Sequence, residues 1–186
     1  LKEPAADFYR RISERLRHKE RAINIWDYEH LILEAFPELY KVKCLNHTKV
    51  LKNSAGIPVG DQEIAPGYVT VVCIPDQRKR NAVDPLKPYT SLATLESIKS
   101  YLLNNKMTLH LELDDRLEVQ NPTFEEIKLE FFVTFHPGLD QSIYQNQLNQ
   151  DLIEFMSPWA YDPDAQQELE FGGSIAKSVL IDFIEE

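Results

Sequence analysis

Large apolar side chains occupy every second position of residues 127–135, and this alternation constrains the fold more than any other stretch of the chain. The row consists of Ile127, Leu129, Phe131, Val133 and Phe135. Side chains two residues apart on a β-strand lie on the same face, so these five would share one face. A face this apolar has to be covered by other elements. We therefore predict a central strand at 127–135, beneath a layer of helices.

The first quarter of the chain predicts two helices. In the first, apolar residues recur every four positions and would share one helical face: Phe8, Ile12 and Leu16. The second is expected to begin at Asp27, a good N-cap residue, with Trp26 and Leu31 spaced as a hydrophobic staple. It should end near Pro37, because proline disfavours helical backbone in the residue before it.

The rest of the chain combines strands and helices. Apolar and β-branched patterns predict strands at 40–44, 68–74, 109–119 and 127–135. Three further helices are expected to begin at Ser91, after Pro137-Gly138 and at Ser174. The predicted order is α-α-β-β-α-β-β-α-α, which indicates an α+β fold with helices packed on mixed or antiparallel sheets.

We expect this order to divide into two units. Residues 1–80 would contain the helical pair and a two-stranded α/β unit, and residues 81–186 a second α/β unit of strands flanked by helices. The chain begins at Leu1 without a methionine and stops in an apolar run that includes Ile184. We interpret it as a fragment of a longer protein.

Charge is distributed unevenly along the chain. Residues 1–52 contain 11 Lys and Arg against 8 Asp and Glu, whereas the remainder contains 9 against 22, so the two parts carry about +3 and −13. A nucleic-acid-binding protein normally has a net basic domain, so the balance argues against such a role for the whole chain. It favours a protein whose two ends face different neighbours.

Two cysteines, Cys44 and Cys73, are too few for a disulfide framework and are predicted to be reduced core thiols.

No apolar run approaches the roughly 18 residues of a membrane span, and the N-terminus lacks a signal-peptide pattern. These features predict no membrane insertion and synthesis in the cytoplasm.

Motifs for catalysis or metal binding are weak. Cys44 and His47 have metal-like spacing, but the sequence supplies no second pair of similar type to complete a structural zinc site. His110 and Glu112 would share a strand face, and the alternating leucines make that face the solvated one. No glycine-rich phosphate loop is present. We therefore predict no enzymatic activity, no cofactor and no metal site.

Four arginines crowd the first helix and lie largely off its apolar stripe: Arg10, Arg11, Arg15 and Arg17. Arginine is enriched at protein interfaces, so we predict that these residues form a protein-interaction surface. The alternatives are a nucleic-acid-binding module that uses this basic helix and a merely solvated face. Glu14 and Glu20 interleave with the arginines, and no aromatic platform accompanies them. A second basic cluster, Arg78-Lys79-Arg80, lies in a predicted loop suited to phosphate.

A series of short motifs runs through nearly the whole chain: Arg15-Leu16-Arg17-His18-Lys19, Trp26-Asp27-Tyr28-Glu29, Lys41-Val42-Lys43-Cys44-Leu45-Asn46-His47-Thr48, Pro85-Leu86-Lys87-Pro88, Val119-Gln120-Asn121-Pro122-Thr123-Phe124, Pro137-Gly138 and Phe155-Met156-Ser157-Pro158-Trp159. In this order they resemble the C-terminal half of the baseplate J-like family of contractile-tail phages and contractile injection systems.

The resemblance implies a structural wedge component of a baseplate, without enzymatic activity. Several copies would surround the central hub and spike and relay the trigger for sheath contraction. The implied partners are other wedge and hub proteins in a hetero-oligomeric assembly. The protein would be made in the bacterial cytoplasm and become part of a phage-tail-like particle.

Overall fold

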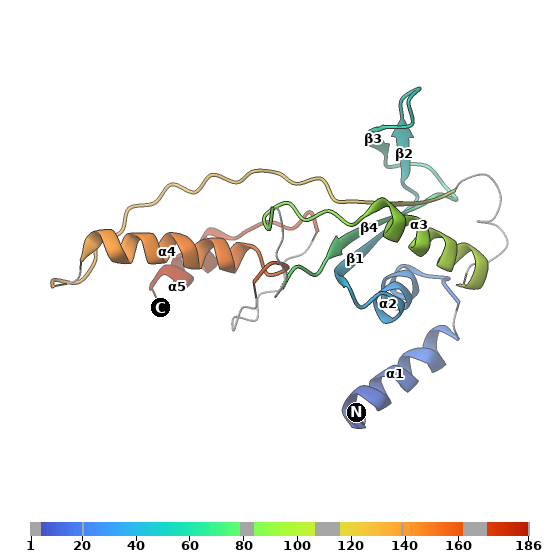
Figure 1. Cartoon of the computed structure of the whole chain (residues 1–186), viewed down its shortest axis with the longest axis horizontal. Coiled ribbons are helices and arrows are strands. Elements are labelled where there is room, and N and C mark those ends of the chain that lie inside the picture. The colour runs from blue at the N-terminus through green and yellow to red at the C-terminus, as the bar shows by residue number, and fades with distance from the viewer. Residues whose placement is uncertain are drawn as a thin grey trace. The chain divides into compact units, whose positions relative to one another are not determined.

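The computed structural model describes residues 5–19, 21–78, 84–106, 116–138, 140–161 and 171–185. Within these ranges the elements are, in chain order (Figure 1), α1 (Ala5–His18), α2 (Ile25–Ala35), β1 (Leu39–Asn46), β2 (Lys49–Lys52), β3 (Pro58–Gln62), β4 (Val69–Pro75), α3 (Leu92–Tyr101), the π-helical turn η1 (Leu102–Lys106), β5 (Leu117–Gln120), α4 (Gln141–Met156) and α5 (Lys177–Glu185). Helices accompany small sheets, so the predicted α+β class is confirmed.

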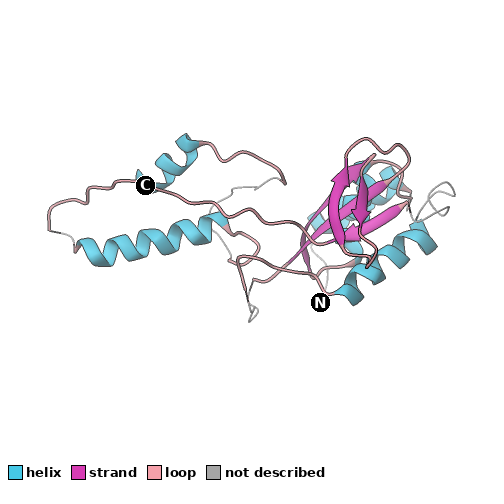
Figure 2. Cartoon of the chain, turned by 90° about the horizontal axis from the view of Figure 1, so that it is seen from above, coloured by secondary structure: helices cyan, strands magenta, loops and turns pink. Residues whose placement is uncertain are grey.

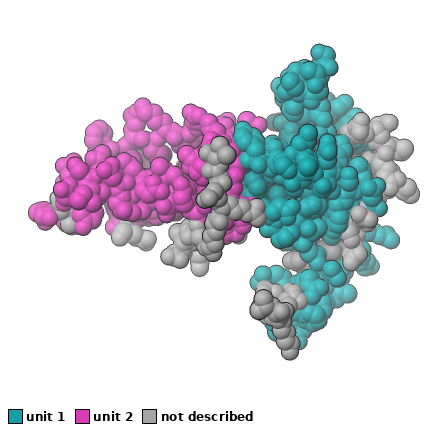
Figure 3. All heavy atoms as spheres, viewed as in Figure 1, with its two compact units in different colours: residues 1–75, 89–122 teal, residues 76–88, 123–186 magenta. Residues whose placement is uncertain are grey.

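The chain forms two compact units, which Figure 3 distinguishes by colour. Unit 1 consists of residues 1–75 and 89–122, and unit 2 consists of residues 76–88 and 123–186. The chain therefore passes from unit 1 to unit 2, returns to unit 1 and ends in unit 2. The division into domains at residue 80 stays a prediction.

Unit 1 is organised around strand β4. The sheet order is β1-β4-β5, with β1 antiparallel and β5 parallel to β4. Five consecutive residues of β4, from Thr70 to Ile74, are buried. A strand buried on both faces reads as a continuous apolar run, which explains the sequence Val69-Thr-Val-Val-Cys-Ile74. The prediction of a buried strand at 68–74 is confirmed.

Helices α2 and α3 pack on this sheet and share one core with it (Figure 1). The largest fully buried side chains come from both helices and from the strands, and they include Leu31, Ile32, Ile98, Val71 and Leu117. Each such side chain contributes about 1.5–3 kcal/mol to folding through its removal from water. The first two helices and the helix from Ser91 are therefore correctly predicted, and Ser91 caps α3 by accepting a hydrogen bond from the Thr94 amide.

The start of α2 differs from the prediction by three residues. Asn24, not Asp27, is the N-cap: its side chain accepts a hydrogen bond from the Asp27 amide at 3.0 Å. Asp27 completes a capping box by accepting a hydrogen bond from the Asn24 amide at 3.0 Å. Trp26 therefore lies inside the helix, where it stacks on His30 with ring centroids 4.0 Å apart. The helix ends at Ala35, as the position of Pro37 predicts.

Strands β2 and β3 form an antiparallel hairpin that the sequence does not predict. Between the strands predicted at 40–44 and 68–74, glycine and proline interrupt any apolar alternation, so the sequence indicates a polar connection there. Asn53 organises the turn through its side-chain oxygen, which accepts hydrogen bonds from the amides of Ala55 and Ile57. Gly56 supplies the positive φ of 77° that this turn requires. Val50 is buried and anchors the hairpin.

The predicted central strand at 127–135 is wrong. These residues are drawn as a long extended loop in Figure 2 and pair with no strand among the described residues. Phe132 is fully exposed, and Ile127 is 58% exposed. Phe135 does pack on Tyr144 of α4, with ring centroids 6.1 Å apart. Alternation predicts extended backbone, but backbone becomes a strand only where a partner strand is available.

The helices of unit 2 depart from the prediction at one end only. α4 begins after Pro137-Gly138, as predicted, and Asp140 caps it by accepting hydrogen bonds from the amides of Ser142 and Ile143. α5 begins at Lys177, so the prediction that Ser174 caps this helix is wrong. The two helices meet where the rings of Phe155 and Phe183 stack 4.2 Å apart.

The strand predicted at 109–119 falls partly outside the described residues, which resume at residue 116. Its last part is β5, where Leu117 and Val119 face the core. His110, Glu112, Asp114 and Asp115 lie outside the described residues.

Candidate protein-binding surfaces

Helix α1 exposes the apolar stripe that the sequence predicts for it. Phe8, Ile12 and Leu16 are 42%, 37% and 73% exposed. Tyr9, next to the stripe, is also largely exposed. The apolar stripe of a surface helix normally faces a core, whereas here the described part of the chain leaves it in contact with solvent. We call this stripe, Phe8, Ile12 and Leu16, the α1 stripe.

The four predicted interface arginines lie on α1, but the structure does not give them one common role. Arg15 forms an ion pair with Glu34 of α2, with Nη2 and Oε1 3.2 Å apart. Arg17 places its guanidinium 4.4 Å from the ring centroid of Trp26, also on α2. Arg11 lies 5.7 Å from the ring centroid of Phe8, and Arg10 is exposed. Arg15 and Arg17 thus attach α1 to α2.

The second predicted basic cluster is only partly within the described residues. Lys79 and Arg80 lie outside them. Arg78 forms a two-point ion pair with Asp76, through Nη2 at 2.7 Å and Nε at 3.0 Å. A guanidinium held in this way already has a carboxylate as its partner.

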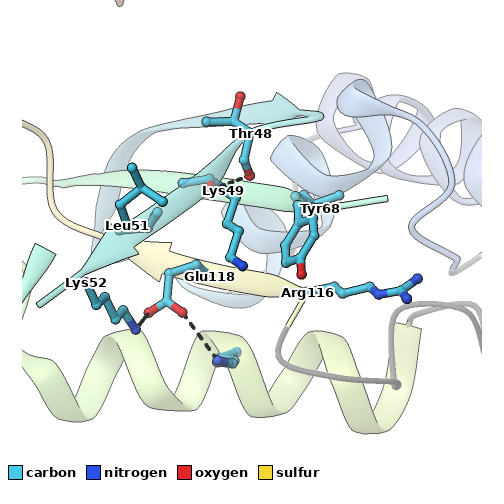
Figure 4. A pocket seen from close by; sticks show the side chains of 11 residues that line it. Thr48, Lys49, Leu51, Lys52, Tyr68, Arg116 and Glu118 are labelled. Carbon is cyan, nitrogen blue, oxygen red and sulfur yellow. Dashed lines mark hydrogen bonds and ion pairs between the residues drawn. The ribbon is translucent and has the colours of Figure 1, made fainter. Parts of the chain in front are cut away.

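A basic groove lies between β2 and strands β4 and β5 of the main sheet, beside α3, and sequence reasoning did not identify it. It has a volume of about 450 Å³. Figure 4 shows its lining side chains, which come from β2, the start of β4, α3 and β5. Four of them are cationic and one is acidic: Lys49, Lys52, Lys99, Arg116 and Glu118. We call this site the basic groove.

Glu118 occupies the middle of the cationic side chains of the basic groove. Its Oε1 lies 2.7 Å from Lys52 Nζ, and its Oε2 lies 3.6 Å from Lys99 Nζ. Lys49 instead places its ammonium 4.8 Å from the ring centroid of Tyr68. The groove therefore shows one carboxylate held between two lysines, beside a further lysine on an aromatic face.

The predicted core thiols are buried, and Cys44 lines a hollow of about 590 Å³ together with His47, Trp26 and Tyr28. Burial, reinforced by the nearby Glu29 charge, raises the pKa of Cys44 to about 12. Metal ligation and nucleophilic attack require a thiolate, and this environment favours the neutral thiol. Among the described residues, no group of three His, Cys, Asp or Glu side chains has the arrangement of a metal site.

Exposed apolar side chains beside charged groups are common at protein-binding surfaces, so the α1 stripe and the basic groove are candidate sites for contact with other proteins. The chain belongs to the PVC11-like baseplate protein family, whose model matches residues 1–186. The predicted resemblance to baseplate proteins of contractile injection systems is confirmed. The described helices include none with the length and apolar character needed to cross a bilayer.

The chain is also similar to one chain in the cryo-EM structure of the anti-feeding prophage baseplate, 6-fold symmetrised. The two share 22% sequence identity and a TM-score of 0.60, over 85% of this chain and 30% of that one. At this identity the likeness shows a common fold. The present chain spans less than a third of the length of the protein that it resembles. No curated protein matches it.

Proposed function

We propose that this chain is a structural wedge component of a contractile injection baseplate. It binds other wedge and hub proteins in a hetero-oligomeric assembly, catalyses no reaction and binds no nucleic acid. It is made in the bacterial cytoplasm and then incorporated into a phage-tail-like particle. Membership of the baseplate family supports the class of particle. The single observation that supports binding by this chain itself is the exposed α1 stripe beside the arginines of the same helix.

In this proposal the α1 stripe provides affinity for the partner, and the arginines provide orientation. Burial of Phe8, Ile12 and Leu16 against a partner supplies affinity, since each square ångström of apolar surface removed from water contributes about 25 cal/mol. The charges of Arg10, Arg11, Arg15 and Arg17 guide encounter and fix the register of docking. Arg15 and Arg17 also hold α1 on α2 through Glu34 and Trp26, so they position the helix that docks.

A single apolar-to-acidic substitution on α1 tests this function. Leu16→Asp places a charge in the α1 stripe, at a position that is 73% exposed in the free chain. We expect its free energy of unfolding to change by less than about 0.5 kcal/mol. Incorporation into baseplates should fall to background, because the charge would have to be buried without a partner. The measurement is the amount of this chain in purified particles from cells that lack the native gene.

Ile64→Asp is the matched control, since Ile64 is 82% exposed and belongs to the loop after β3 and not to α1. This variant should assemble as the unmodified chain does. Normal incorporation of Leu16→Asp would contradict the docking role of α1. Salt-dependent binding of duplex DNA that is lost in an Arg10→Glu, Arg11→Glu variant, without a defect in assembly, would favour the nucleic-acid alternative.

A further inference from the structure

The basic groove is separate from α1 in the sequence and brings together four cationic side chains from β2, from α3 and from the residue before β5. Lys49 and Lys52 belong to β2, Lys99 to α3, and Arg116 immediately precedes β5. We propose that the groove binds an acidic, carboxylate-bearing peptide segment of a partner protein. This inference rests on the proposed function, in that the chain assembles with other proteins, and it adds a second contact of defined chemistry.

The charge of the groove is opposite to that of the chain as a whole. Among the described lining residues, four cations and one carboxylate give a net charge of +3, whereas the whole chain carries −10. Cationic side chains that lie close together repel one another, and a nearby anion offsets this repulsion. Glu118 compensates only Lys52 and Lys99. Among the described residues, no carboxylate pairs with Lys49 or Arg116.

Glu118 shows how the groove holds a carboxylate. Each of its oxygens faces a different lysine, at 2.7 and 3.6 Å, and its side chain is only 24% exposed. A second carboxylate, brought by a partner, would lie towards Lys49 and Arg116, the two cations to which the described part of the chain supplies no carboxylate. Contact with the Tyr68 ring limits the conformations of Lys49, which reduces the entropy lost when it binds an anion.

The same geometry favours a peptide over a nucleic acid. Proteins that bind single strands stack bases on exposed aromatic faces. Tyr68 is the one aromatic residue among the described lining residues, and the Lys49 ammonium lies over its ring. Glu118, in the middle of the cations, would repel a continuous row of phosphates. Leu51, 42% exposed at the groove, offers apolar contact to a peptide side chain. A volume of about 450 Å³ accommodates a few side chains, not a duplex.

Binding of a fluorescein-labelled peptide of consecutive glutamates to the whole 186-residue chain tests the proposal. We expect binding at low ionic strength that weakens as salt is added. The double variant Lys49→Glu, Arg116→Glu should weaken binding about tenfold or more, since it reverses both uncompensated charges. The double variant Lys128→Glu, Lys177→Glu changes the net charge equally outside the groove and should bind as the unmodified chain does.

Circular dichroism checks that each variant folds, and Lys49→Gln, Arg116→Gln replaces the charge reversal if that variant unfolds. No binding by the unmodified chain, or equal binding by the groove and control variants, overturns the inference. So does a single-stranded oligonucleotide that binds more tightly than the peptide and loses its binding in the same variant. If purified particles contain the unmodified chain but the groove variant binds the peptide normally, the proposed role of the groove is wrong and the proposed function is unaffected. Particles that lack the unmodified chain would refute the proposed function.

Discussion

At the scale of single residues, one carboxylate attaches α2 to the sheet and another fixes the start of the helix. Glu29 of α2 accepts a hydrogen bond from the Cys44 amide of β1 at 2.9 Å. Asp27 is 2% exposed and accepts hydrogen bonds from the amides of Ile23 and Asn24. A buried carboxylate is tolerated because such donors replace the water that it loses. These hydrogen bonds fix the start of α2 and hold the helix on β1.

The two buried thiols should make folding stability sensitive to alkaline pH. Burial raises the pKa of Cys44 and of Cys73 from the ordinary 9.0 to about 12. Above pH 9 the unfolded chain releases these protons and the folded chain keeps them, so the stabilisation present below pH 9 is lost as pH rises towards 12. Urea denaturation should show lower stability at about pH 10 than at neutral pH.

A Cys44→Ala, Cys73→Ala variant is the control for this dependence. It should be less stable at neutral pH, because two buried side chains are shortened, but its stability should fall less between the two pH values. Tyr28, whose pKa burial also raises, remains in both proteins. An equal fall in the two proteins would show that the thiols do not cause the effect.

At the scale of elements, the exposed segment 127–135 and the core of unit 1 should respond differently to the same type of truncation. Phe131→Ala should cost less than about 1 kcal/mol in the isolated chain, because Phe131 is 37% exposed and lies outside the buried core of the described residues. Ile98→Ala, at a fully buried position of α3, should cost about 2–5 kcal/mol. Chemical denaturation measures both. A loss above about 3 kcal/mol for Phe131→Ala would indicate that this residue is in a core.

Local pattern was sufficient for elements whose neighbours are close in sequence, and insufficient elsewhere. α4 was predicted correctly because its apolar spacing and flanking turn are local. The segment at 127–135 has a strand pattern, but pairing depends on a distant partner that its own residues do not specify. The β2–β3 hairpin was missed because Pro58 and Gly60 are unusual in strands, so the pattern of β3 does not indicate one. The two strands pair nevertheless, and Asn53 and Gly56 form the turn between them. The true cap of α2 had a signal, because Asn24 stands three residues before Asp27.

At the scale of the whole molecule, the sequence predicted the class of protein better than its surfaces. The motifs from Arg15 to Trp159 indicated a baseplate protein, which the family membership confirms. The basic groove was not predictable, because its cationic residues are spread over the sequence from Lys49 to Arg116 and only the fold brings them together. The arginines of α1 were evident as a cluster, but their attachment to Glu34 and Trp26 follows from the position of α2.

The central claim, that this chain is a structural part of a contractile baseplate, is tested most directly by quantitative mass spectrometry of purified particles. Cells that produce the full protein with its particle genes would be the source, and intact particles would be separated from free protein by sedimentation. We predict that peptides of this chain are present at a fixed ratio to those of the hub, and that this ratio is unchanged by washing. Absence of the chain from washed, contraction-competent particles would contradict the claim.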